Sequence, residues 1–216
     1  MTINPNITIF GGTGDLTFRK LLPALYTMHV AGKLPENSRI LIIGRRDYDS
    51  AAYRETARNW VEKFTRLPFR PADFQAFAGK IDYYRMDFSD HEAYRGLNRY
   101  YAGNRIGSHI FYFAVAPRFF SVITEGLKLV DGAKNGKVII EKPFGEDLAA
   151  AKTLNGELED YFGPEQIYRI DHYLGKEMVR NIQAIRFTNP IFTDIWNSGH
   201  IESVQISALE DMGVET

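Results

Sequence analysis

Ile7-Thr8-Ile9-Phe10-Gly11-Gly12-Thr13-Gly14-Asp15-Leu16 runs from a short apolar segment directly into a glycine-rich turn. Helical spacing of apolar side chains follows, from Leu16 to Val30. The order strand, glycine turn, helix brings backbone amides and a helix N-terminus to a phosphate group in parallel-sheet proteins. Thr13 stands where the common G-x-G-x-x-G pattern has its second glycine, so a plain tight turn is the alternative. The context of the turn favours phosphate binding.

Further apolar runs of strand character recur along the chain, at 40–43, 81–86, 110–115, 138–140 and 167–170. Segments with helical periodicity separate them, at 51–64, 91–101, 119–130 and 148–161. Alternating strands and helices predict an α/β fold, a doubly wound parallel sheet of the Rossmann type. Pro23 should bend or restart the first helix, because proline cannot donate the hydrogen bond that a helix interior needs.

The pattern changes after Gly175. A helical segment is expected from Lys176 to Phe187, followed by an irregular stretch through Pro190, Trp196 and Gly199. Alternating apolar and polar residues then predict a strand at 203–209. We therefore expect two parts, a dinucleotide-binding domain at 1–175 and the opening of a second domain at 176–216.

Composition excludes several classes of function. The 26 basic and 27 acidic residues give a net charge of −1, which provides no long-range field for nucleic acid or an anionic membrane. Cysteine is absent from the sequence, and no histidine pair has ligand spacing with a carboxylate partner, so no metal site is expected. The first residues lack a signal-peptide pattern and no apolar stretch has membrane-spanning length. A cytoplasmic location is the expectation.

Two arginines follow the second predicted strand. Arg45 and Arg46 come directly after Gly44, where an NAD-selective protein usually places a carboxylate for the ribose hydroxyls. A guanidinium group binds phosphate oxygens in a bidentate manner, so arginine here favours the 2′-phosphate of NADP. Two solvated loop arginines are the alternative, and Asp47 leaves some use of NAD possible.

Two further motifs complete the pattern: Glu141-Lys142-Pro143-Phe144-Gly145, and the run from Arg169 to Glu177. His172 and Lys176 are four residues apart, so a helix that begins by Asp171 would place both on one face for a single anion. Alone, they would more often be a capping histidine and a surface charge. Together with the glycine turn, the motifs resemble those of the glucose-6-phosphate dehydrogenase family, in the same order and over most of the chain.

This resemblance implies oxidation of glucose 6-phosphate at C1 to 6-phosphogluconolactone, with hydride transfer to NADP. The second domain would be an α+β domain with a large antiparallel sheet, of which residues 203–209 are the first strand. The implied cofactor-binding residues are Gly11, Gly12, Thr13, Gly14, Asp15, Leu16, Arg45, Arg46, Asp87, Phe88, Ala114, Pro117 and Lys142. The implied substrate-binding residues are Lys142, His172, Tyr173, Lys176 and Glu210, and Pro143 would follow a cis peptide bond.

The resemblance also implies a catalytic arrangement and an assembly. Asp171 would be the carboxylate that orients a base histidine, and that histidine would lie beyond Thr216. The 216 residues are therefore expected to bind cofactor but to be nearly inactive by themselves. Full-length members of the family self-associate through the second domain, of which only the opening is expected here, so the oligomeric state of this chain is left open.

Two alternative interpretations of these motifs are open. Glu-Lys-Pro also occurs in sugar dehydrogenases of the glucose–fructose oxidoreductase type, which lack the motif from His172 to Lys176. A non-catalytic NADP-sensing module is the second alternative, and in it Asp171 to Lys176 would be structural.

Overall fold

The computed structural model describes residues 4–145 and 147–207, apart from the side chains of residues 172 and 174. The chain separates into two compact units, Met1–Ile170 and Asp171–Thr216, which are described separately here. The boundary follows the last strand of the sheet, whereas the sequence analysis placed it after Gly175. Residues 171–175 group with the second unit because their turn packs on the helix that follows it.

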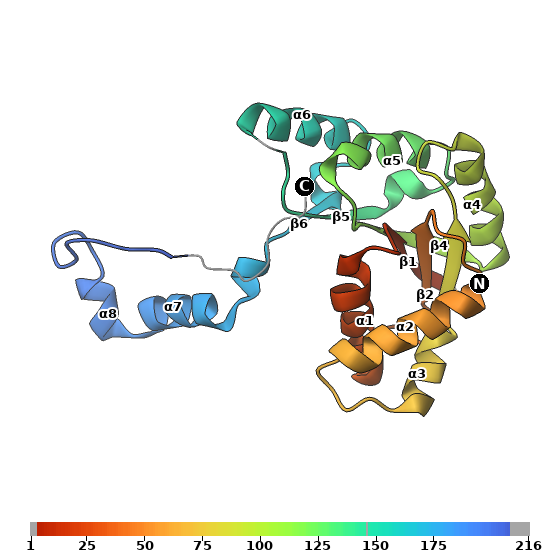
Figure 1. The fold of residues 1–216 in the computed structure, drawn as a ribbon. Coiled ribbons are helices and arrows are strands. Elements are labelled where there is room, and N and C mark those ends of the chain that lie inside the picture. Colours follow the sequence, from red (N-terminus) through yellow and green to blue (C-terminus); the bar gives the residue numbers. More distant parts are fainter. Residues whose placement is uncertain (1–3, 146, 208–216) are drawn as a thin grey trace. The chain divides into compact units, whose positions relative to one another are not determined.

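The first unit is built on one six-stranded parallel sheet (Figure 1). Its strand order is β3-β2-β1-β4-β5-β6, so the order reverses between β1 and β4. The strands are β1 (Asn4–Phe10), β2 (Arg39–Gly44), β3 (Ile81–Arg85), β4 (Ile106–Phe113), β5 (Lys137–Glu141) and β6 (Ile167–Ile170). Each coincides with one of the expected apolar runs, and the predicted doubly wound sheet is confirmed.

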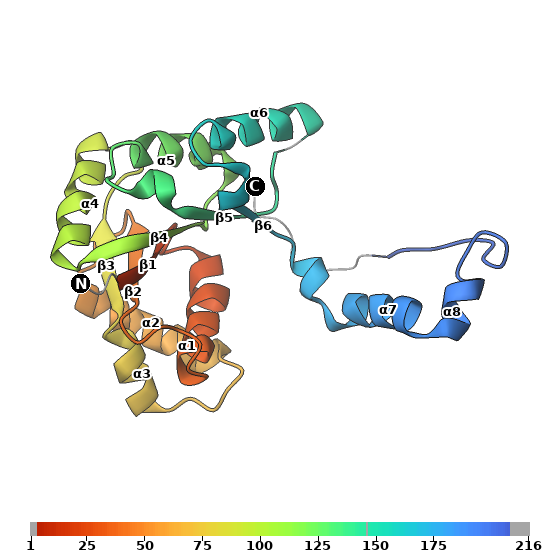
Figure 2. The ribbon, with the colours of Figure 1, turned by 180° about the vertical axis from the view of Figure 1, so that it is seen from behind.

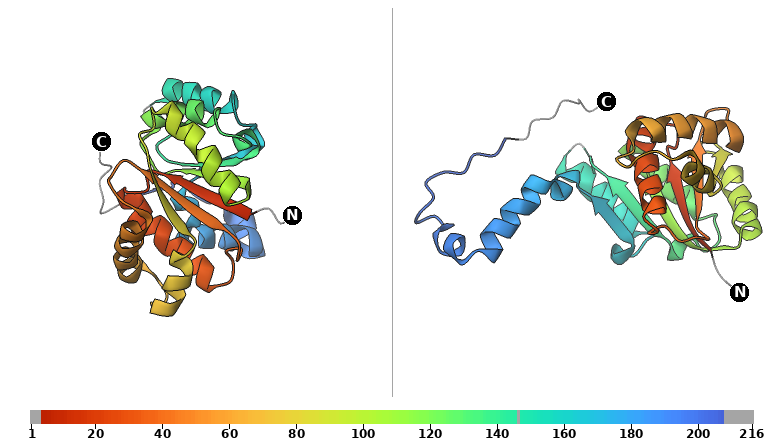
Figure 3. Two further views of the ribbon diagram at one scale, coloured as in Figure 1. Left: turned by 90° about the vertical axis from the view of Figure 1, so that its right-hand side faces the viewer. Right: turned by 90° about the horizontal axis from the view of Figure 1, so that it is seen from below.

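Helices cover both faces of this sheet, as the views from opposite sides and from the edge show (Figures 2 and 3). One face carries α1 (Leu22–Val30), α2 (Ser50–Phe64) and α3 (Pro71–Ala78). The other carries α4 (His91–Gly103), α5 (Phe120–Leu127) and α6 (Leu148–Glu159). Two separate apolar cores result, one on each face, because side chains alternate across a strand.

Two details of the helices bear on the sequence analysis. A π-helical turn, Thr17–Leu21, comes first, and α1 restarts at Leu22 with Pro23 in its first turn, as expected. Helix α3 was missed. It has eight residues, too few to show a clear period, and the rings of Phe74 and Phe77 pack around Tyr26. Tertiary packing, which a sequence pattern does not record, therefore stabilises this helix.

The described part of the second unit, residues 171–207, contains a 3-10 turn and two helices. The turn is η5 (His172–Gly175), and the predicted helix is present as α7 (Glu177–Thr188). The stretch expected to be irregular contains α8 (Pro190–Ile195), since Pro190 suits the first turn of a helix. The expected strand at 203–209 is not formed over the described residues 203–207, because a strand requires a hydrogen-bonded neighbour. Residues 208 and 209 lie outside the described part.

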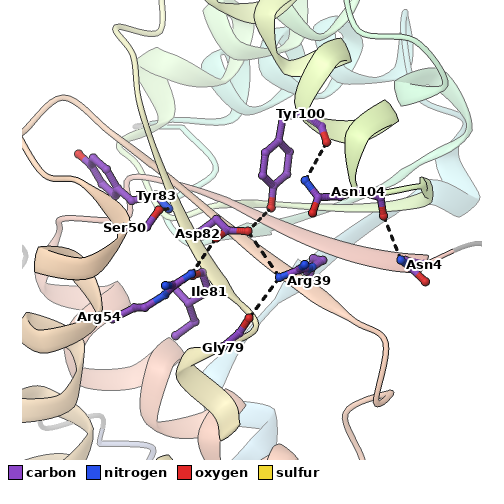
Figure 4. Close-up of polar contacts among 10 residues, drawn as sticks. All are labelled: Asn4, Arg39, Ser50, Arg54, Gly79, Ile81, Asp82, Tyr83, Tyr100 and Asn104. Atoms are coloured by element: carbon purple, nitrogen blue, oxygen red, sulfur yellow. Dashed lines mark hydrogen bonds and ion pairs between the residues drawn. The ribbon is translucent and has the colours of Figure 1, made fainter. Parts of the chain in front are cut away.

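A polar network braces the amino-terminal edge of the sheet (Figure 4). Asp82, at the start of β3, accepts hydrogen bonds from Arg54 Nη2 of α2 and from the Tyr100 hydroxyl of α4, both at 2.8 Å. Arg54 Nε also donates to the Ile81 carbonyl at 2.7 Å, and Arg39 Nη1 lies 3.8 Å from Asp82 Oδ2. One carboxylate thus joins strand β3 to a helix on each face of the sheet.

Across the described helices, none combines the length and apolar character needed to cross a membrane. Within residues 4–145 and 147–207, no group of three acidic or histidine side chains is arranged to hold a metal ion.

Candidate dinucleotide-binding site

The glycine turn packs closely between the ends of β2 and β4. Gly11 has a φ of 87°, and a Cβ there would lie 2.1 Å from the Ala114 carbonyl oxygen. Gly12 is buried, its N–H donates to the Ile43 carbonyl at 2.8 Å, and a Cβ there would lie 2.0 Å from Ile42 Cγ2. Both positions therefore require glycine, one for its backbone conformation and both for space.

The helix begins directly from this turn. Gly14 N–H donates to the Gly11 carbonyl at 3.0 Å, and the Thr17 hydroxyl donates to the same oxygen at 3.1 Å. The first bond of helical spacing runs from Phe18 N–H to the Gly14 carbonyl at 3.3 Å. The N–H groups that precede it belong to a helix N-terminus, where the helix dipole and the free donors favour an anion.

A cleft of about 580 Å³ opens above this turn at the carboxyl edge of the sheet. It spans the point where the strand order reverses, which is where ligands bind in open α/β sheets. Its charged lining residues are all arginines: Arg45, Arg46 and Arg118. The other lining residues are Gly11, Thr13, Gly14, Gly44, Phe88, Ala114, Val115, Ala116 and Phe119. The cleft therefore suits a polyanionic ligand with flat, apolar parts.

Two tyrosines hold the glycine turn and the arginine loop. The Tyr53 hydroxyl donates to the Gly12 carbonyl at 2.5 Å, and the Tyr83 hydroxyl donates to the Arg46 carbonyl at 2.8 Å. Their rings stack, with centroids 5.0 Å apart. Burial raises the pKa of Tyr53 well above its ordinary value, so its hydroxyl stays a donor at neutral pH. Helix α2 thereby holds the glycine turn, and strand β3 holds the arginine loop.

Asp47, which left NAD use open, lies outside the cleft lining. Its carboxylate pairs with Arg85 Nη1 at 2.8 Å, across the ends of β2 and β3. The two arginines before it, in contrast, both face the cleft.

Of the two cofactor candidates after β3, Phe88 lines the cleft and Asp87 does not. Phe88 lines the cleft, and its ring packs edge-on against Phe10 and Phe119, with centroids 6.0 and 5.6 Å away. Asp87 does not line the cleft, because its carboxylate accepts hydrogen bonds from Ser89 N–H at 3.0 Å and Ser89 Oγ at 2.7 Å. These bonds, with a smaller effect of Arg45, lower the pKa of Asp87.

The segment after β4 contributes more than the sequence analysis expected. Ala114 lines the cleft, whereas Pro117 only begins a short 3-10 turn, Pro117–Phe119. Arg118 and Phe119 of this turn were missed, and both line the cleft, with the Arg118 guanidinium carbon 5.1 Å from the Phe119 ring centre. Their position directly after a strand end was the available signal.

The remaining cofactor candidates, Gly12, Asp15, Leu16 and Lys142, do not line the cleft. Gly12 is buried beneath the turn, Asp15 pairs with Arg19 Nε at 2.6 Å, and Leu16 lies in the first turn of the helix. Lys142 follows β5 with an exposed side chain, and the Lys142–Pro143 peptide bond is cis, as the resemblance implied.

In the second unit, the motif from Asp171 to Lys176 corrects one expectation. Asp171 accepts a hydrogen bond from Tyr173 N–H at 3.0 Å and caps a 3-10 turn that ends at Gly175. Lys176 has an extended backbone, and α7 begins only at Glu177, so His172 and Lys176 do not share one α-helical face. Helical spacing therefore does not bring these two residues together, because the carboxylate cap closes a tight turn before the α-helix starts.

One side-chain contact within this motif joins Lys176 to Tyr173. The Lys176 Nζ lies 4.0 Å from the centre of the Tyr173 ring, within the range of a cation–π contact. The side chain of His172 and all of Glu210 lie outside the described residues.

Comparisons with known families match nearly the whole chain. The family model described as "Glucose-6-phosphate dehydrogenase, NAD binding domain" matches residues 8–181. The model described as "Glucose-6-phosphate dehydrogenase, C-terminal domain" matches residues 183–216.

Similar curated proteins carry the same name. The chain is 41% identical to glucose-6-phosphate 1-dehydrogenase of Gluconobacter oxydans and 38% identical to that of Dickeya dadantii, over 96% and 97% of its length. It spans 43% of each of those relatives.

Two solved structures resemble the chain at a TM-score of 0.79. One is glucose-6-phosphate 1-dehydrogenase from Mycobacterium avium, 30% identical, with 92% of this chain and 42% of that one covered. The other is a glucose-6-phosphate dehydrogenase in complex with glucose 6-phosphate, 32% identical, with 91% and 42% covered.

Proposed function

Because this chain belongs to the glucose-6-phosphate dehydrogenase family, we propose that its first unit binds NADP for oxidation of glucose 6-phosphate at C1 to 6-phosphogluconolactone. The observation that carries the proposal is the cleft over the glycine turn, whose charged lining residues are three arginines. A helix N-terminus and this positive lining match the pyrophosphate and the 2′-phosphate of NADP. When bound, NADP supplies the hydride acceptor.

The preference for NADP over NAD rests on the loop after β2. Arg45 and Arg46 line the cleft there, and the Tyr83 hydroxyl holds the backbone of Arg46. Asp47, the acidic residue nearest this position in the sequence, is engaged by Arg85. Arginines that face the ligand and a carboxylate that is paired elsewhere favour binding of the phosphorylated ribose.

Arg45→Ala should weaken NADP binding by about tenfold to a hundredfold and leave NAD binding nearly unchanged, because only NADP carries the 2′-phosphate. Isothermal titration of the 216-residue chain with each dinucleotide measures this. Arg58→Ala is the matched control, since it removes an exposed arginine that lies in α2, outside the cleft lining. Equal losses for both dinucleotides would contradict the assignment of Arg45 to the 2′-phosphate.

For the substrate, we propose that His172, Tyr173 and Lys176 bind the 6-phosphate of glucose 6-phosphate, and that Lys142 and Glu210 contact the sugar. Support comes from the motif match and from the cation–π contact of Lys176 with Tyr173, which restrains the lysine side chain. An ammonium group suits a phosphate dianion by charge alone and does not require a helical face. Lys142 additionally contacts the cofactor in this proposal.

The chemistry requires a proton acceptor, since the C1 hydroxyl must lose its proton as hydride departs. We propose Asp171 as the carboxylate that orients a base histidine, in line with the family resemblance. None of the five histidines of the printed sequence is assigned as that base. Asp171 already caps the turn of the motif through Tyr173 N–H, so its position is set by local structure.

Lys176→Ala should weaken binding of glucose 6-phosphate to the NADP-loaded chain by at least about tenfold, through loss of a charge-assisted contact. Chemical-shift titration follows this binding even in the millimolar range. Lys128→Ala, which removes an exposed lysine paired with Glu125 on α5, is the matched control.

Two outcomes of this titration would favour the other readings of the sequence. An unchanged affinity for glucose 6-phosphate in Lys176→Ala would favour a sensor in which the motif is structural. Stronger binding of free glucose than of its 6-phosphate would favour the glucose–fructose oxidoreductase type. Homo-oligomerisation through the second domain stays a prediction.

A further inference from the structure

One partly buried hydrogen bond at the carboxyl edge of the sheet has no role in the function described so far. Tyr112 of β4 is 8% exposed, and its hydroxyl donates to Oε1 of Glu141, the last residue of β5. Tyr112 lies opposite Ile139 in the register of the two strands, and Glu141 is two residues further on. Both side chains therefore project from the same face of the sheet.

The direction of this bond is defined. A carboxylate accepts hydrogen bonds, and burial together with neighbouring Glu141 raises the pKa of Tyr112 well above its ordinary value. The phenol is consequently protonated at neutral pH and donates to a charged acceptor, which makes the bond stronger than one between neutral groups.

We place the nicotinamide at the end of the cleft that Ala114 lines, as the family resemblance implies, and the bond lies beside that end. Phe113 pairs with Ile140 in the register, so the next residues along the two strands are Ala114 and Glu141. Ala114 lines the cleft, and its carbonyl oxygen is the atom that a side chain at Gly11 would strike. Glu141 in turn directly precedes Lys142.

We propose that Tyr112 is a positioning residue, which holds Glu141 at the end of β5 and thereby sets the backbone that presents Lys142 to the nicotinamide half of the cofactor. This inference rests on the proposed function, because it requires a dinucleotide in the cleft. It concerns Lys142 alone and leaves the adenosine half unaffected, which by the family resemblance binds near Phe88 and whose 2′-phosphate we assign to Arg45. Tyr112 itself does not line the cleft.

The first test compares two ligands. Tyr112→Phe should weaken NADP binding by about three- to tenfold and leave 2′-phospho-ADP-ribose, which lacks nicotinamide, bound as in wild type. Tyr161→Phe is the matched control, since its hydroxyl donates to the Leu127 carbonyl at 3.0 Å on the opposite face of the sheet. An equal loss for both ligands, or no loss for either, would overturn the proposal.

The second test asks whether Tyr112 acts through Glu141. Glu141→Ala should reproduce the selective loss, and adding Tyr112→Phe to it should cause no further change in NADP affinity. Additive losses would mean that Tyr112 acts by another route, which would refute the inference.

The third test needs no ligand. Amide hydrogen exchange in a peptide covering residues 138–145 should be faster by severalfold in Tyr112→Phe than in wild type or Tyr161→Phe. Unchanged exchange would overturn the inference whatever the binding data show. Failure of the proposed function is distinguishable from failure of this inference, because the wild-type chain would then bind neither NADP nor 2′-phospho-ADP-ribose.

Discussion

Gly11→Ala is expected to abolish measurable dinucleotide binding and to lower the free energy of unfolding by more than about 3 kcal/mol. Two physical effects add. The φ of 87° is strained for any residue with a side chain, and the new methyl group would lie 2.1 Å from the Ala114 carbonyl oxygen. That oxygen belongs to the backbone at the end of β4, so it cannot rotate away as a side chain could. The turn must shift, and the cleft wall with it.

Gly32→Ala separates these two effects. Gly32 also has a positive φ, 66°, but a side chain there would meet no atom within 4 Å. We expect a loss of only about 1 kcal/mol and unchanged NADP binding, since the strain is present without the clash. Urea unfolding followed by circular dichroism gives the stabilities, and calorimetric titration gives the affinities. Similar stability losses for the two variants would show that the contact with Ala114 is unimportant.

Asp82→Ala is expected to lower the free energy of unfolding by about 2–3 kcal/mol. Asp82 lies at the amino-terminal ends of the strands, whereas the cleft lies at their carboxyl ends. The carboxylate is 22% exposed and accepts two hydrogen bonds at 2.8 Å, from Arg54 and from the Tyr100 hydroxyl. Its removal takes the acceptor from the Tyr100 phenol and the carboxylate partner from the partly buried Arg54 guanidinium, which keeps its bond to the Ile81 carbonyl. Strand β3 is the outermost strand of the sheet and pairs with β2 on one side only, so the loss of Asp82 also weakens the attachment of β3 to α2 and α4.

Asp47→Ala is the control for this prediction. Asp47 pairs with Arg85 at the same distance, 2.8 Å, but its side chain is 88% exposed. Water screens such a pair and side-chain entropy opposes it, so we expect a change within about 0.5 kcal/mol. Denaturant midpoints of the two variants provide the comparison. If Asp47→Ala were as destabilising as Asp82→Ala, exposure would not be what distinguishes the two ion pairs.

The alternation of apolar runs and helical segments was sufficient to predict all six strands and the α/β class. Burial explains this success, because strands covered on both faces must be apolar throughout and stand out from their surroundings. Helix α3 was not predictable in the same way. Its stability depends on Tyr26, a residue far away in the sequence, against which Phe74 and Phe77 pack.

The candidate site was predictable in part. The glycine turn, Arg45 and Arg46 were identified from motifs and strand ends, and Phe88 from the family resemblance; the structure brings most of them to one cleft. Arg118 was overlooked, since one arginine after a strand has no distinctive pattern. His172 and Lys176 do not share the face that a helix beginning by Asp171 would provide, because the capping bond from Tyr173 N–H to Asp171 closes a short turn there and α7 begins at Glu177.

The sequence by itself determined the strand order along the chain, the positions that require glycine and the family to which the protein belongs. The strands and the glycine positions are local, since they depend on residue type and on spacing within one turn or one strand, and the family follows from three such local motifs in their order along the chain. Only the tertiary structure decided that Asp47 pairs with Arg85, that Asp82 joins β3 to two helices, and that Tyr112 holds Glu141. Each of these contacts joins elements whose separation in space depends on the packing of the whole sheet, which spacing along the chain does not encode.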